Sequence, residues 1–78
     1  PTHFNPTTTI RFEVGGWGFV SMKVFDVLGR EVATLMSQPL DSGPHSVVFD
    51  GSPHPSGVYF YRLQVENSTL QRPMVLLK

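Results

Sequence analysis

Apolar and polar residues alternate along most of this chain, and glycine and proline separate the alternating segments. The longest such segment is 58–66, and one of its faces carries Tyr59, Tyr61, Leu63 and Val65. A period of two is the geometry of a β-strand, whose successive side chains point to opposite faces of a sheet. Because each apolar face must be buried against another element, the pattern predicts a fold built from packed sheets.

Further alternating segments predict strands at 8–14, 19–27, 31–35, 45–50, 69–72 and 74–78. Short strands that recur about every 8–12 residues are typical of a small antiparallel β-sandwich. We therefore expect an all-β sandwich of six to seven strands over residues 8–78. Residues 1–7, with two prolines, are expected to form an extended linker,.

Glycine and proline residues between the predicted strands indicate loops and turns. Residues 38–44 contain two prolines and a glycine and are expected to form a loop,. Pro73 separates the last two segments, so they form either one bulged edge strand or two strands. Asp26 followed by Gly29 indicates a type I turn closed by a left-handed glycine.

A helix competes with a strand only over 30–36. Val32, Leu35 and Met36 lie at helical spacing in this segment. It offers only about two turns before Pro39, and isolated helices shorter than ~12 residues are marginal. A glycine directly before the segment also suits a bulged hairpin, so we expect the strand.

Composition excludes several classes of function. The chain has 78 residues, six basic and six acidic side chains and no cysteine, which indicates one small neutral domain. It offers no general electrostatic field for nucleic acid, no disulfide and no thiolate chemistry. No apolar run approaches the ~20 residues of a membrane-spanning helix. Residues 1–6 do not resemble a signal peptide, so an export signal is expected upstream of this module,.

The residues that usually carry catalysis are few and scattered. His3, His45 and His54 are not at zinc-ligand spacing, and no nucleophile elbow or phosphate loop occurs,. We therefore expect no enzyme activity, no metal and no cofactor. Trp17 lies among three glycines and is the candidate for stacking on a sugar ring. Tyr59 and its neighbours cannot share such a platform, because adjacent strand residues face opposite sides.

Four segments carry a family resemblance: FNPTTTIRF at 4–12, VFDVLGREV at 24–32, SGVYFYRL at 56–63 and MVLLK at 74–78. In this order, and across almost the whole chain, they resemble the C-terminal sorting domain of the type IX secretion system, the Por secretion tail of Bacteroidetes and related phyla. Pro73 departs from the family, which more often has a lysine or another residue able to pair in a strand there.

The resemblance implies a small immunoglobulin-like sandwich that acts as an address tag rather than as an enzyme. It implies an upstream cargo domain in the same polypeptide, recognition by the type IX outer-membrane translocon, and removal by a sortase-like peptidase. The cargo would pass through the periplasm and end at the cell surface or outside the cell.

The positions that match the family motifs are the candidate recognition residues. They are Asp26, Gly29, Arg30, Gly57, Tyr59, Arg62, Met74, Val75, Leu76, Leu77 and Lys78. The apolar final segment suits recognition by strand addition, in which backbone hydrogen bonds give affinity and alternate side chains give specificity.

Two rival functions remain open. One is a carbohydrate-binding module of a secreted hydrolase, which would use Trp17. The other is a passive spacer, or an immunoglobulin-like domain that joins an assembly as in flagellar hook-capping proteins.

Overall fold

The computed structural model describes residues 6–78, which form antiparallel strands and no helix. The strands are β1 (Thr7–Val14), β2 (Gly18–Phe25), β3 (Glu31–Leu40), β4 (Gly43–Asp50), β5 (Gly57–Val65) and β6 (Ser68–Leu76). The predicted all-β sandwich is therefore confirmed, with six strands among the described residues. Residues 1–5 of the expected linker, with His3 and the start of the first motif, lie outside the described residues.

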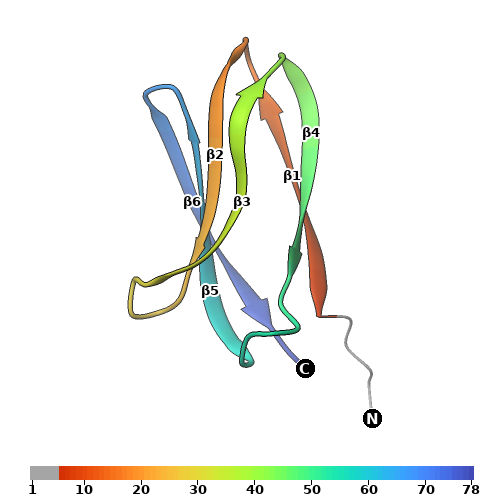
Figure 1. Cartoon of the computed structure of the whole chain (residues 1–78), viewed down its shortest axis with the longest axis vertical. Coiled ribbons are helices and arrows are strands. Elements are labelled where there is room, and N and C mark those ends of the chain that lie inside the picture. Colours follow the sequence, from red (N-terminus) through yellow and green to blue (C-terminus); the bar gives the residue numbers. More distant parts are fainter. Residues whose placement is uncertain (1–5) are drawn as a thin grey trace.

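The strands form two sheets that face each other (Figure 1). One sheet has four strands in the order β3-β2-β5-β6, and the other pairs β1 with β4. In the larger sheet β2 and β5 are central, while β3 and β6 are edge strands. A two-stranded sheet cannot cover the whole inner face of a four-stranded one, so part of the larger sheet stays open.

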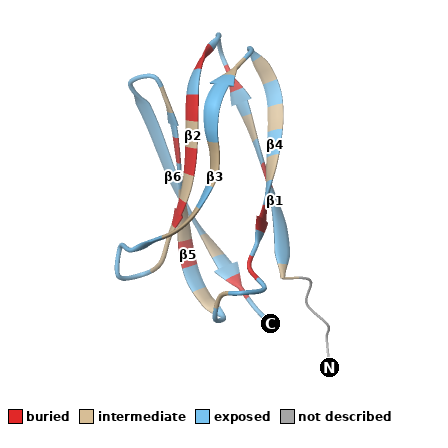
Figure 2. Cartoon of the chain, in the orientation of Figure 1, coloured by how far each residue is buried: buried red, intermediate tan, exposed pale blue. Residues whose placement is uncertain are grey.

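The core lies between the sheets and is centred on β2. Val20, Met22 and Val24 on its inner face have no exposed surface, as the predicted alternation requires (Figure 2). Strands β1, β4, β5 and β6 contribute one or two buried apolar side chains each, namely Ile10, Val14, Phe49, Tyr59, Leu63 and Leu76, whereas β3 contributes only partly buried ones. Burial of these apolar side chains drives the two sheets together.

The segment after the β2–β3 turn is a strand, as expected, and not a helix. It is longer than predicted, because β3 continues to Leu40 and β4 begins at Gly43. The expectation of a loop over 38–44 was therefore wrong. Pro39 pairs with Phe19 in the ladder, and an edge strand tolerates proline because half of its N–H groups point away from the sheet.

The last two predicted segments form one strand. β6 pairs with β5 in an unbroken register from Val65–Ser68 to Gly57–Leu76, and Pro73 lies opposite Phe60 within it. Of the two alternatives, the single edge strand is confirmed, whereas the bulge and the division at Pro73 were wrong. The physical reason is again the position of the strand, since β6 is the edge of its sheet,.

The dominance of β2 in the core predicts the response to truncation there. Met22→Ala should lower the free energy of unfolding by about 2–5 kcal/mol, because it removes a fully buried side chain and leaves a cavity,. Val48→Ala is the matched control, since Val48 is 56% exposed, and should cost less than about 1 kcal/mol. Urea unfolding measures both. Equal losses would show that β2 is not the centre of the core.

Candidate functional site

The middle motif forms the hairpin between β2 and β3, and Asp26 organises it. The Gly29 amide donates to the Asp26 carbonyl at 3.0 Å, which closes the turn. The amides of Leu28 and Arg30 donate to Asp26 Oδ1 at 2.9 and 3.0 Å. Gly29 has φ of 81°, the left-handed conformation predicted for it,.

Arg30 completes this hairpin by pairing with the same carboxylate, its Nε lying 2.7 Å from Asp26 Oδ2. Partial desolvation acts to raise the pKa of Asp26, but the hydrogen bonds from Arg30 and Leu28 outweigh it. The pKa of Asp26 therefore lies below its ordinary value of 3.8. Val27 and Leu28 at the tip are 66% and 73% exposed, so the turn presents apolar side chains to solvent.

The late motif forms the start of β5. Tyr59 is 5% exposed, and its ring lies 6.2 Å from the ring of Phe49. Its hydroxyl donates to the Pro55 carbonyl at 2.7 Å, which supplies the partner that a buried tyrosine needs. Gly57 has φ of 156°, which L side chains rarely adopt. These residues shape the loop between β4 and β5.

The final motif joins β6 to that same loop. Leu76 is 8% exposed and lies against Gly51, whereas Val75 and Leu77 are 64% and 50% exposed. Lys78 follows β6, and its Nζ donates to the Ser52 carbonyl at 2.6 Å. One side chain thus anchors the segment while the residues on either side of it stay accessible.

Polar groups of the loop between β4 and β5 also form hydrogen bonds with Lys78. The Lys78 amide donates to Ser56 Oγ at 3.1 Å. The pKa of Asp50 is lowered first by the Ser52 amide and hydroxyl, against partial desolvation, and further by the nearby charges of His54 and Lys78. The terminal segment is therefore held at this end of the sandwich by named contacts.

Register places apolar residues from three strands side by side on the outer face of the larger sheet. Phe25 pairs with Phe60, and Phe60 pairs with Pro73 on its other side. In the next row Val58, 40% exposed, pairs with Val75. We call these residues the outer apolar patch: Phe25, Val58, Phe60, Pro73 and Val75.

A polar row borders this patch. Lys23, Arg62 and Gln71 follow each other across β2, β5 and β6. Arg62 lies over the ring of Phe25, 4.4 Å from its centroid, and its Nε donates to Gln71 Oε1 at 3.3 Å. Arg62 therefore marks the edge of the outer apolar patch, and β6 contributes to both rows.

The comparison with known families identifies the chain. The model of the secretion system C-terminal sorting domain family matches residues 3–77. The chain belongs to this family. No curated protein and no solved structure shows a significant match. The resemblance of the four motifs to the type IX sorting domain is thereby confirmed.

Membership fixes the general role of this sorting domain. Domains of the family serve type IX secretion as the C-terminal tail of a cargo protein that is exported to the cell surface or beyond. The family is a sorting signal rather than a catalytic one. Among residues 6–78 no helix is long and apolar enough to cross a membrane.

Over the described residues 6–78, no group of three or more His, Cys, Asp or Glu side chains is placed so that it could bind a metal ion. His45 stacks on Phe12 with ring centroids 5.8 Å apart, and its Nε2 lies 2.8 Å from the Asp41 carbonyl. His54 stacks on Phe49, 5.6 Å away. Both rings therefore pack against aromatic side chains of the smaller sheet, Phe12 of β1 and Phe49 of β4.

The sequence alone did not predict the outer apolar patch, although the alternation of residues in one strand indicated part of it. The alternation in 58–66 already placed Val58 and Phe60 opposite Tyr59. The missing information was the register that sets Phe25 and Pro73 beside Phe60, since pairing between distant strands is not encoded in a local pattern.

The lowered pKa of Asp26 makes the hairpin acid-sensitive. A carboxylate whose folded pKa is depressed stabilises the fold above its ordinary pKa, and this contribution is lost as the pH falls through the folded value. Asp26→Asn keeps an oxygen for the amides of Leu28 and Arg30 but loses the ion pair. Wild type should melt higher than Asp26→Asn at neutral pH, and the gap should close below pH 3.8. A gap unchanged at the acid end of the series would contradict this assignment.

The hydroxyl of Tyr59 is predicted to be worth about 1 kcal/mol, the usual net value of one hydrogen bond. Tyr59→Phe removes its bond to the Pro55 carbonyl without changing the ring. Tyr61→Phe is the matched control, because its ring is only half-buried on the same strand. Chemical denaturation should show a loss for the first variant and almost none for the second. Two equal losses would refute the role of the hydroxyl.

Proposed function

We propose that the outer-membrane translocon of the type IX system recognises this sorting domain in its folded form, through β6, residues 74–78 and the outer apolar patch. The observation that carries the proposal is the exposure of Val75 and Leu77 on a segment that Leu76 anchors. Exposed apolar side chains on an ordered strand are typical of a protein interaction site.

The edge position of β6 supports the same assignment. β6 is the last strand of its sheet, with β5 as its neighbour, so the N–H and C=O groups on its outer edge are open to another strand. Strand addition there would supply affinity from backbone hydrogen bonds, and the side chains of the patch would supply specificity. Because β6 pairs with β5 along its whole length, the open edge of β6 and the outer apolar patch belong to the same sheet.

The hairpin and the β4–β5 loop would act by positioning this surface. Asp26, Gly29 and Arg30 fix the turn that continues from Phe25 of the patch. Gly57 and Tyr59 fix the loop on which Lys78 rests. Their contribution to sorting would therefore pass through the shape of residues 74–78 rather than through direct contact.

Processing completes the proposed role. The cargo reaches the periplasm through a signal elsewhere in the polypeptide, and the translocon carries it across the outer membrane. A sortase-like peptidase then cleaves upstream of β1, which begins at Thr7, and the residues before β1 serve as the linker to the cargo. The cargo is released or attached to surface lipopolysaccharide.

A reporter export assay tests the proposal. Residues 1–78 joined to the C-terminus of a periplasmic reporter should carry it to the surface or the medium of a bacterium with a type IX system. Val75→Asp should leave most of the reporter in the periplasm, because it places a charge in the outer apolar patch. Val48→Asp is the matched control at 56% exposure on β4, and should be exported normally.

Thermal unfolding of both variants separates recognition from folding. The proposal requires that Val75→Asp and Val48→Asp melt at similar temperatures while only the first blocks export. Periplasmic retention of the wild-type fusion with its domain folded, or normal export of a folded Val75→Asp fusion, would overturn the proposed recognition surface.

A further inference from the structure

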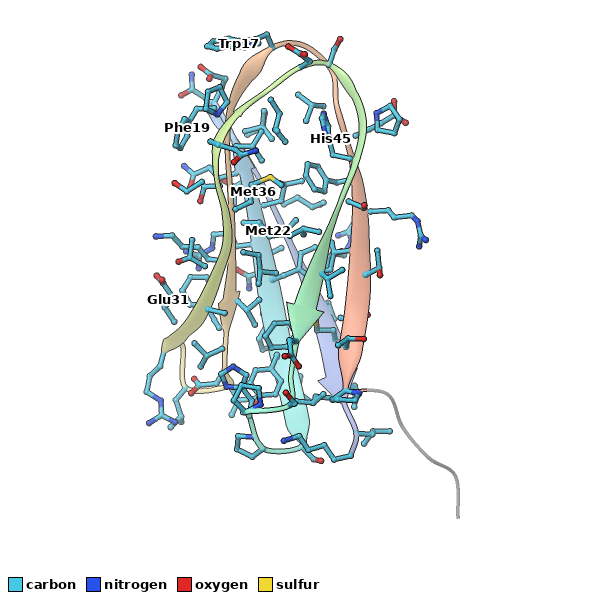
Figure 3. All side chains as sticks on the ribbon, turned by 45° about the vertical axis from the view of Figure 1, so that its right-hand side comes forward. Trp17, Phe19, Met22, Glu31, Met36 and His45 are labelled. Atoms are coloured by element: carbon cyan, nitrogen blue, oxygen red, sulfur yellow. The ribbon has the colours of Figure 1, made fainter. Side chains whose placement is uncertain are left out.

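A second exposed feature lies at the opposite end of β2 from the hairpin. Trp17 and Phe19 are 70% and 49% exposed and stand on either side of the buried Gly18. Trp17 lies in the bend before β2, and Phe19 is on β2. Figure 3 shows Phe19 on the outer side of the larger sheet, away from Met22 between the sheets, and Trp17 at the tip of the molecule above it.

Stability does not account for these two rings. Neither belongs to the clusters that form the core. Gly15 and Gly16 before Trp17 have no neighbouring atoms near the position of a Cβ, so the tip is open. Large aromatic side chains usually contribute by being buried, and a pair left in solvent is better suited to bind a partner.

Polar side chains border Phe19 and give the site its chemistry. Ser21, Gln64, Glu66 and Asn67 line, with Phe19, a shallow hollow of about 390 Å³. Ser21 pairs with Gln64 across β2 and β5. No hydrogen bond from the side chains of Ser21, Gln64 or Asn67 to another residue of the described part of the chain occurs. Their donors and acceptors are therefore available to a ligand.

Glu66 holds Phe19 in place beside this hollow. Its Oε2 accepts the Phe19 amide at 2.9 Å, and its backbone takes the left-handed φ of 51° in the turn between β5 and β6. The carboxylate makes the hollow acidic, and no lysine or arginine lines it. An anionic ligand would be repelled here, whereas a neutral one would not.

We propose that Trp17, Phe19 and this hollow bind a neutral glycan. Sugars combine apolar C–H faces, which stack on aromatic rings, with hydroxyl groups, which exchange hydrogen bonds with amides and hydroxyls. The site offers both, since the ring of Phe19 lines the hollow with Gln64 and Asn67, and the exposed Trp17 lies two residues before Phe19 in the chain. Nucleic acids and acidic lipid surfaces are selected by cations, and no lysine or arginine lines this hollow. The inference is independent of the proposed sorting role.

Trp17 is the only tryptophan of the chain, so its fluorescence reports directly on binding at this site. Residues 1–78 are titrated with three neutral polysaccharides, a soluble β-glucan, a mannan and a xylan, and with alginate as the anionic control. At least one neutral polysaccharide should shift the Trp17 emission to shorter wavelength in a saturable manner, and alginate should not. Amide NMR shifts should change at Phe19, Gln64 and Asn67.

Variants assign the binding to the site. Phe19→Ala and Gln64→Ala should each weaken binding about tenfold, as loss of an anchoring contact does. Leu28→Ala, at the other end of β2 and 73% exposed, should bind as wild type does. Absence of any response to all three neutral polysaccharides would overturn the proposal. So would an equal loss in Leu28→Ala, or a response to phosphatidylcholine vesicles in place of the polysaccharides.

Discussion

The inner face of β2 is the contact on which the rest of the domain depends. Val20 and Met22 pack with residues of β1 and β5, while Val24 packs with Phe49 and Tyr59 in the second cluster. β2 also pairs with both β3 and β5. With 78 residues and no cysteine, the fold has no disulfide to replace this packing.

A core centred on one strand leaves the margins of the sandwich open. Seven of the nine residues of β6, all but Met74 and Leu76, are exposed. The same strand is therefore weakly buried and well displayed, and its anchor is Leu76 near Phe49 and Tyr59. This contact couples the packing of the interior to the position of residues 74–78.

Local chemistry was predictable from the sequence, and long-range pairing was not. Asp26 and Gly29 form the expected turn because turn geometry depends on adjacent residues,. The helical spacing of Val32, Leu35 and Met36 has a different origin. Register shifts between β2 and β3 indicate bulges at which consecutive residues are half-buried,. A pattern read without its partner strand cannot distinguish such bulges from a helical turn.

The two prolines show the same limit. Pro39 falls in a segment expected to be a loop, and Pro73 in one expected to be either a bulged edge strand or two strands, yet both lie within regular edge strands. Whether a strand is at an edge depends on the sheet order, which is a property of the whole fold. The membership of the outer apolar patch depends on that order too, since its residues come from β2, β5 and β6.

The central claim is that the folded domain is recognised at β6. Amide hydrogen exchange of the sorting domain, alone and bound to the purified type IX translocon, tests it most directly. The account predicts that binding slows exchange in β6 and residues 74–78 while β4 is unchanged. Slowed exchange confined to β1 and β4, or loss of protection in β2 on binding, would contradict it.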